Sequence, residues 1–272
     1  MRLFFSVLAV IAGFSSLAYA DKASPLRPLL TGNDSRGWEA VGRLNIAGRT
    51  MCTGALIAPD LVLTAAHCLF DKRSEQQVDA TTIQFLAGWR NGRATAYANV
   101  KRAVAHPEYT YADDSNTIRV RNDVALLQLT RPIRKTSITP FETGTRPRKG
   151  ADVGIVSYAH DRAESPSIQE SCRVLARQSG MLILSCDVDF GSSGAPVFEM
   201  IDGSPRIVSV VSAMAEVNGR KVSLGTSIED PLIVLKEQLI ATEGTYKRPL
   251  PTTHSLISRG SPGRSGAKFV RP

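Results

Sequence analysis

Short apolar stretches recur along the chain from Trp38 onward, separated by turn-forming residues. Residues 41–46 alternate apolar and polar side chains, as a half-buried β-strand does. Residues 55–58 and 61–64 are apolar runs on either side of Pro59-Asp60, which predicts a buried hairpin. The same pattern predicts further strands over 82–86, 96–105, 124–129, 153–158, 182–186 and 206–213. Many short strands with frequent turns indicate an all-β sandwich or barrel rather than an alternating α/β fold.

One helix is predicted near the C-terminal end of this region, over residues 230–242. Asp230 can cap it and Pro231 suits its first position. Three leucines recur on one face of this helix: Leu232, Leu235 and Leu239. We expect that face to pack against the barrel formed by the last strands.

The first 20 residues have the features of a secretory signal peptide. A positive start at Arg2 is followed by a short apolar run and by Ala18-Tyr19-Ala20, which predicts cleavage after Ala20. Gly13, Ser15 and Ser16 interrupt the apolar run, which is short compared with the ~20 residues of a bilayer span. We therefore expect an exported protein, secreted or periplasmic, without stable membrane insertion.

Two segments flank the main domain, which we place at residues 38–242. Residues 21–37 are rich in Pro, Gly, Ser and charge, and are interpreted as an irregular lead-in or a short propeptide. Residues 243–272 are interpreted as a basic disordered tail, a solvated extension rather than a surface-binding arm. The formal net charge of +8 sets solubility and association kinetics and does not identify a nucleic-acid partner. The sequence carries no signal for an oligomeric state.

An even number of cysteines in an exported chain indicates disulfides. Four cysteines allow three pairings, and proximity favours Cys52 with Cys68 and Cys172 with Cys186. A zinc site is not supported, because the chain has no CxxC or HxxxH pair and its histidines are scattered. We therefore expect no metal.

Three short motifs carry residues suited to nucleophilic catalysis. His67 follows an apolar run within Leu-Thr-Ala-Ala-His-Cys, and Asp123 precedes another, where a buried carboxylate needs a hydrogen-bonding partner. Ser193 lies between Gly191 and Gly194, which permit a sharp loop whose N–H groups can face a developing oxyanion. The order His, Asp, Ser excludes the nucleophile elbow of α/β-hydrolases, where the serine comes first.

These motifs resemble those of the trypsin-like serine peptidase superfamily. The matching segments are CTGALIAPDLVLTAAHC (52–68), NDVALL (122–127) and GSSGAPVF (191–198). The resemblance covers about residues 38–242 and is closest to bacterial trypsin-like and V8-like (glutamyl-endopeptidase-like) members. It implies two six-stranded antiparallel Greek-key β-barrels, with the active site in the cleft between them and a C-terminal helix. The interval between Cys52 and Cys68 matches the disulfide that braces the histidine loop in that family.

The resemblance also implies roles for individual residues. His67 would be the general base, Asp123 would orient it, and Ser193 would be the nucleophile that forms an acyl-enzyme. The N–H groups of Gly191 and Ser193 would form the oxyanion hole. Protein or peptide substrates are expected, and no cofactor is required.

The sequence departs from the family pattern before the nucleophile. Ser192 occupies the position where animal trypsin-like enzymes have an acidic residue that pairs with a new N-terminus, and no Arg-Ile-Val-Gly-Gly activation sequence is present. Our hypothesis is that the oxyanion loop forms without that ion pair.

Substrate preference remains open between basic, glutamyl and small apolar residues. Asp187 lies at the interval where trypsin-like enzymes place the acid that selects Lys or Arg, and Ser212 is assigned to the same pocket. However, Cys186 directly precedes Asp187, and Asp189 stands where relatives have a cysteine. The alternative is that Asp187 and Asp189 are solvated or turn-capping carboxylates.

Two other classes of function are alternatives to the endopeptidase. A catalytically silent member of the fold could act as a basic binding protein, with the tail as its adhesive arm. A structural exported protein would leave the order His, Asp, Ser to chance. Retention of all three residue types favours the serine endopeptidase.

Overall fold

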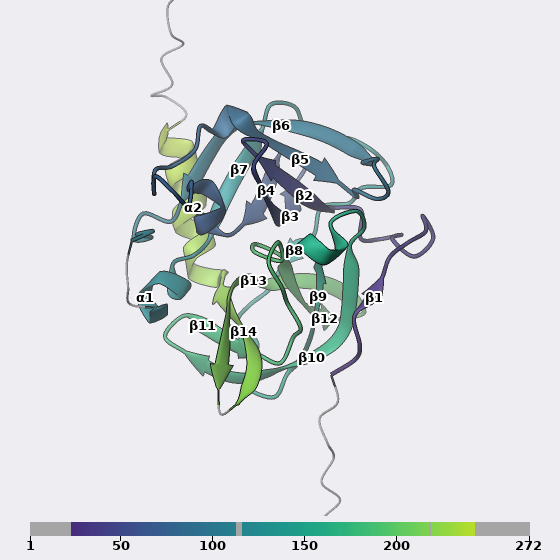
Figure 1. Ribbon diagram of the computed structural model, residues 1–272, viewed down its shortest axis with the longest axis vertical. Coiled ribbons are helices and arrows are strands. Elements are labelled where there is room, and N and C mark those ends of the chain that lie inside the picture. The colour runs from purple at the N-terminus through teal and green to yellow at the C-terminus, as the bar shows by residue number, and fades with distance from the viewer. Residues whose placement is uncertain (1–22, 113–115, 218, 243–272) are drawn as a thin grey trace, which may run out of the picture.

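In the computed structural model, residues 23–112, 116–217 and 219–242 are described, and they form two β-barrels and a C-terminal helix (Figure 1). The first barrel closes in the order β2-β3-β4-β7-β6-β5, because β5 also pairs with β2. Its neighbouring strands are antiparallel. Its strands are β2 (Val41–Ile46), β3 (Thr50–Ala58), β4 (Leu61–Thr64), β5 (Ile83–Ala87), β6 (Ala96–Ala105) and β7 (Ala125–Leu129).

The second barrel also has six antiparallel strands, in the order β9-β10-β11-β14-β13-β12, and β12 pairs with β9 to close it. These strands are β9 (Asp152–Ser157), β10 (Ser167–Gln178), β11 (Met181–Leu184), β12 (Pro196–Ile201), β13 (Ser204–Val217) and β14 (Arg220–Ser227). Two short strands join this sheet: β1 (Arg27–Pro28) pairs with β10, and β8 (Glu142–Thr143) pairs with β13. The expected double-barrel architecture is confirmed.

The apolar pattern located most of the first barrel and missed parts of the second. The predicted hairpin is present, since Ala58 pairs with Leu61 and leaves Pro59-Asp60 as the turn. Strands β10, β12 and β14 were not predicted. In β14 the buried positions include Ser223 and Thr226, whose hydroxyls donate to the carbonyl oxygens of Cys186 and Val120. A strand that buries hydrogen-bonded polar side chains has no apolar alternation to detect.

The segment before the first barrel has little regular structure, but it is attached to the second barrel. The Ser24 N–H donates to the Ser171 carbonyl oxygen, and the Leu29 N–H to that of Pro166. The Leu29 side chain is fully buried in the main core cluster. Residues 24–29 therefore contribute to the packing of the fold.

The C-terminal helix, α2 (Glu229–Ala241), is present, but two expectations about it were wrong. It packs mainly against β6 and β7 of the first barrel rather than against the second (Figure 1), although the core cluster that holds its buried leucines also includes Ile207 and Val210 of β13. Asp230 does not cap it, because the cap residue is Ile228, which makes no side-chain cap.

A short helix, α1 (Asn116–Arg121), was not predicted. Within the described ranges, neither helix is long and apolar enough to cross a membrane.

Candidate active site

His67 lies where the first barrel meets the second, directly after β4. It is in the 3₁₀ helix Ala66–Leu69, whose residues Ala66, Cys68 and Leu69 are buried. A disulfide joins Cys68 to Cys52 on β3, so the turn that carries His67 is tied covalently to the barrel. This pairing and the Cys172–Cys186 disulfide are the two that proximity favours.

Asp123 lies between α1 and β7, with a side chain only 2 % exposed. Its Oδ1 accepts the His67 backbone N–H at 2.8 Å, and its Oδ2 lies 2.6 Å from His67 Nδ1. The Ser212 hydroxyl also donates to Oδ2. An ionised carboxylate only accepts hydrogen bonds, so it selects the neutral tautomer that has its proton on Nδ1 and its lone pair on Nε2.

Ser193 is brought to the same place from the second barrel by its backbone. Its carbonyl oxygen accepts the Thr53 N–H at 2.8 Å, and the following Gly194 N–H donates to Val211 at 2.7 Å. A Cβ on Gly194 would lie 2.5 Å from the Thr53 oxygen and 2.8 Å from the Ala65 nitrogen, two residues before His67. Only glycine permits this close approach, which is also made at a φ of +76°. Within the described residues no hydrogen bond joins Ser193 to His67.

The backbone before Ser193 presents two N–H groups without partners. Among the described residues, no acceptor is bonded to the N–H of Gly191 or of Ser193, whereas the Ser192 N–H donates to the Asp189 carbonyl. The Gly191 carbonyl accepts the Thr53 hydroxyl at 3.0 Å, and that hydroxyl accepts the Tyr158 N–H at 3.1 Å. These bonds fix the peptide between Gly191 and Ser192, which lies between the two free N–H groups.

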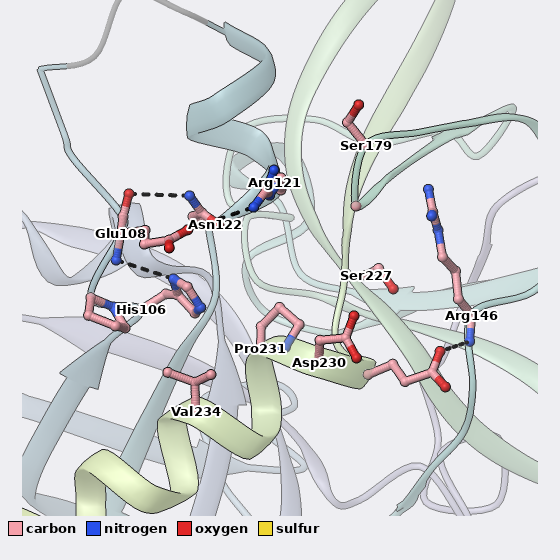
Figure 2. A pocket seen from close by; sticks show the side chains of 13 residues that line it. His106, Glu108, Arg121, Asn122, Arg146, Ser179, Ser227, Asp230, Pro231 and Val234 are labelled. Atoms are coloured by element: carbon pink, nitrogen blue, oxygen red, sulfur yellow. Dashed lines mark hydrogen bonds and ion pairs between the residues drawn. The ribbon is translucent and has the colours of Figure 1, made fainter.

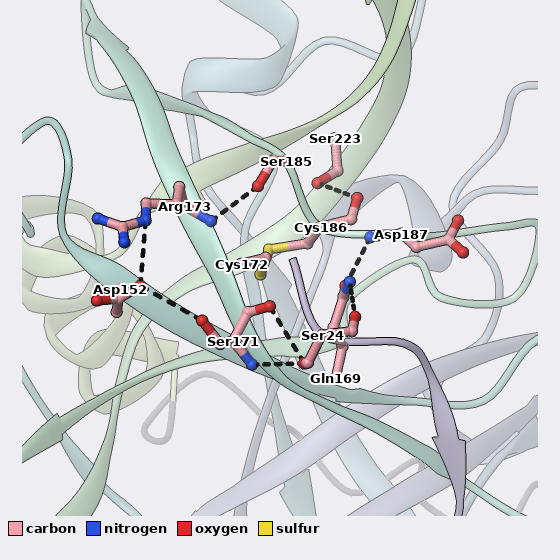
Figure 3. Close-up of a disulfide and its surroundings, with 10 residues drawn as sticks. All are labelled: Ser24, Asp152, Gln169, Ser171, Cys172, Arg173, Ser185, Cys186, Asp187 and Ser223. Carbon is pink, nitrogen blue, oxygen red and sulfur yellow. Dashed lines mark hydrogen bonds and ion pairs between the residues drawn. A yellow bond between two sulfur atoms is a disulfide. The ribbon is translucent and has the colours of Figure 1, made fainter. Parts of the chain in front are cut away.

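A cavity of about 620 Å³ lies beside this loop. Its wall includes three carboxylates and one lysine: Asp187, Asp189, Glu216 and Lys221. The Asp187 N–H donates to Gln169 Oε1, and Asp187 follows the Cys172–Cys186 disulfide, as Figure 3 shows. Asp189 Oδ1 accepts the Phe190 N–H, so this carboxylate is turn-capping, whereas Ser212 does not line the cavity and contacts Asp123 instead.

A second cavity, of about 460 Å³, lies at the start of α2 (Figure 2). His67, Asp123 and Ser193 do not line it. His106 lines it, with Nδ1 accepting the Glu108 N–H at 3.3 Å. Burial lowers the pKa of His106, and Arg121 lowers it further, while Glu108 opposes both effects. A neutral, hydrogen-bonded His106 therefore has a structural role beside Asn122.

One group of possible metal ligands occurs at the site: side-chain atoms of Cys52, Cys68 and His67 lie within 4.8 Å of one another. The two sulfurs are joined in a disulfide and cannot act as thiolate ligands. This group is therefore unsuited to holding a metal ion.

Two closed barrels, with a hydrogen-bonded Asp–His pair on one and a Gly-Ser-Ser-Gly loop of the other held against it, define the class of double-barrel serine peptidases. The chain belongs to the trypsin family, whose model matches residues 32–221.

Individual relatives match over shorter stretches. A glutamyl endopeptidase from Bacillus licheniformis is 27 % identical over 62 % of this chain, and human cathepsin G is 35 % identical over 33 %. The matches span 51 % and 30 % of those proteins' own lengths, respectively. A solved structure of a Glu endopeptidase in complex with MPD superposes with a TM-score of 0.64, covering 80 % of this chain and 97 % of the other at 18 % identity. At that identity the structural likeness supports the fold.

Several residues that support this site were not found from the sequence. Thr53 bridges the loop to Tyr158, and the Thr226 hydroxyl donates to the carbonyl oxygens of Val120 and Asp123. Arg162 donates to Ser192. Each of these contacts joins segments far apart in the chain, and no local motif marks them.

Proposed function

We propose that this protein is an exported serine endopeptidase that uses His67, Asp123 and Ser193 to form an acyl-enzyme. The observation that carries the proposal is the 2.6 Å contact between His67 Nδ1 and a buried Asp123 carboxylate, with the Ser193 loop hydrogen-bonded to Thr53 on β3 beside it. The two disulfides fit an oxidising compartment outside the cytosol, in agreement with the leader expected over residues 1–20.

The chemistry follows from the protonation states of the site. His67 Nε2 takes the Ser193 hydroxyl proton as Ser193 Oγ bonds to the scissile carbonyl carbon. The carbonyl oxygen becomes an oxyanion, which the N–H groups of Gly191 and Ser193 stabilise by hydrogen bonds. Each such donor typically raises kcat by about 10²–10³-fold. His67 then gives the proton to the leaving amine as the C–N bond breaks, and water hydrolyses the remaining ester by the same route. Asp123 holds the imidazole orientation and stabilises its cation throughout.

The pocket beside the loop favours a basic residue before the scissile bond. Three carboxylates line the cavity with Lys221, and the nearby Arg162 offsets part of the charge of Asp187 and Asp189. The net charge of these five groups is therefore negative and favours a substrate ammonium or guanidinium over a substrate glutamate. Of the two neighbouring aspartates, Asp189 accepts the turn N–H of Phe190, and we therefore assign Asp187 to substrate recognition.

The test is mass-spectrometric mapping of cleavage sites in a peptide library, with the mature protein and its Ser193→Ala variant. We expect cleavage after Lys or Arg, lost in the variant together with labelling by a sulfonyl fluoride. Asp187→Asn should lower kcat/KM for basic substrates by at least about tenfold. Asp202→Asn, in the turn between β12 and β13, is the matched control.

Each outcome separates one part of the proposal from the others. Cleavage after Glu or small apolar residues would keep the mechanism and reject the Asp187 assignment. No cleavage and no labelling would favour a basic binding protein that has kept the peptidase fold without its activity.

A further inference from the structure

Arg162 is a largely buried cation on the second-barrel side of the site, next to the loop that carries Ser193. It ends the 3₁₀ helix His160–Arg162, which follows β9, and its side chain is only 15 % exposed. Nη1 donates to the Ser157 carbonyl at 2.6 Å and to the Ser157 hydroxyl at 3.2 Å. Nη2 donates to the Ser192 hydroxyl at 3.3 Å. The planar guanidinium thus donates hydrogen bonds from two nitrogens to two different residues and holds them at a fixed separation.

Ser192 links Arg162 to the oxyanion loop. It is fully buried, directly between the two residues whose N–H groups are free, Gly191 and Ser193. Its hydroxyl donates to the Tyr158 carbonyl at 3.2 Å and accepts the Asp189 N–H at 3.3 Å. A hydroxyl has one proton and two lone pairs, so the bond from Arg162 completes its capacity. Removing Arg162 takes one donor from the Ser192 hydroxyl and the guanidinium hydrogen bonds from Ser157, which destabilises this arrangement of the loop.

The surrounding contacts make the loop depend on this segment. The His160 N–H donates to the Phe190 carbonyl at 2.8 Å, and Gly191 packs so closely that an added Cβ would lie 3.0 Å from Ala159. Three carboxylates act on Arg162, those of Asp161, Asp187 and Asp189. Burial lowers the pKa of Arg162 and these carboxylates oppose that effect, but a guanidinium remains charged over the working pH range of an enzyme.

We propose that Arg162 is the positioning residue of the oxyanion hole, holding Ser192 and thereby the N–H groups of Gly191 and Ser193, so that no new N-terminus is needed. This inference rests on the proposed peptidase function. It makes Arg162 a permanent internal cation in place of one released by cleavage.

The first test replaces Arg162 by methionine, which keeps much of the side-chain volume and removes the donors. We expect kcat for a peptide substrate to fall about 10- to 100-fold with little change in KM, because the oxyanion forms only during the reaction. The affinity for a peptide aldehyde, whose adduct carries an oxyanion, should fall with kcat, and that for the matching peptide alcohol should not. The exposed Arg131, replaced in the same way, is the control.

The second test uses Arg162→Lys, which remains informative if the methionine variant does not fold. The introduced ammonium loses its proton at alkaline pH, whereas the guanidinium does not. We expect the variant to lose kcat between about pH 8 and pH 10 while the wild-type profile stays level. If Arg162 had only a structural role, the Arg162→Lys variant would not show this loss of kcat at alkaline pH.

These results separate the inference from the proposed function. Wild-type labelling that depends on Ser193 establishes the nucleophile regardless of Arg162. With that in hand, wild-type kcat and aldehyde affinity in Arg162→Met, or a level alkaline profile in Arg162→Lys, would overturn the positioning role. If the wild-type protein neither cleaves nor labels, the proposed function itself fails.

Discussion

The two barrels hold their parts of the active site by different means. The first barrel places His67 and Asp123 at the ends of apolar strands. A disulfide lies beside His67, and the Asp123 carboxylate makes three hydrogen bonds. The second barrel places Ser193 on a loop of small residues, held by hydroxyl, carbonyl and guanidinium hydrogen bonds. Comparing them shows which part is fixed by burial and which depends on a polar network.

The difference has a physical basis in what each part must do. The hydrogen-bonded pair of Asp123 and His67 must be held in one orientation before the reaction, and the ends of strands in a closed barrel provide that. The oxyanion loop must leave two N–H groups without partners, so other groups have to satisfy the atoms around them. Small polar residues allow this because they bring hydroxyls without bulk.

The largest effect is expected at the fixed pair, from Asp123→Asn. An amide retains the shape but can stabilise the wrong imidazole tautomer, so kcat should fall about 10⁴-fold. Steady-state kinetics on a peptide ester, with thermal unfolding as the folding control, measures this. A loss of less than tenfold in a folded variant would show that Asp123 does not orient His67.

The disulfides should contribute similarly to stability and differently to activity. Their cysteines are 16 and 14 residues apart, so removing either pair by double alanine substitution should lower the free energy of unfolding by about 3 kcal/mol. Losing Cys52 and Cys68 should mainly lower kcat, because Cys68 follows His67. Losing Cys172 and Cys186 should mainly raise KM, because Cys186 precedes Asp187. The opposite split of kcat and KM would contradict this division between the barrels.

Leu29 tests whether the lead-in is part of the fold. Leu29→Ala should lower the free energy of unfolding by about 2–3 kcal/mol, since this side chain is fully buried in the main core. Leu30→Ala is the matched control, because the side chain of the adjacent Leu30 is 55 % exposed. Chemical denaturation compares the two. If deleting residues 23–30 raised activity without loss of stability, the segment would be a propeptide instead.

The smallest effect concerns the second histidine of the first barrel. The pKa of His106 is lowered by burial, so the unfolded chain binds a proton there more readily as pH falls through about 6.5, and folding stability decreases. His106→Asn keeps an acceptor for the Glu108 N–H and removes this titration. The drop in melting temperature between pH 7.5 and 5.5 should therefore be smaller in the variant. An unchanged drop would mean that His106 does not titrate in this range.

Prediction from the sequence succeeded where the signal was local. Strands β2 and β6 have the predicted bounds, and the leucines of α2 are buried as expected. It failed where burial was polar, as in β14, and where the partner was distant, as for the packing of α2 on the first barrel. Helix periodicity shows which face is buried but not which surface buries it.

The sequence by itself determined the three motifs, their order and the cysteines that accompany them, because each motif encodes its own turn and its own side-chain chemistry. Only the tertiary structure decided how they are joined. The hydrogen bond from Ser212 to Asp123 spans 89 residues, and that from Arg162 to Ser192 spans 30. Such contacts form when barrel closure brings separate strand ends together, and no local pattern encodes that closure.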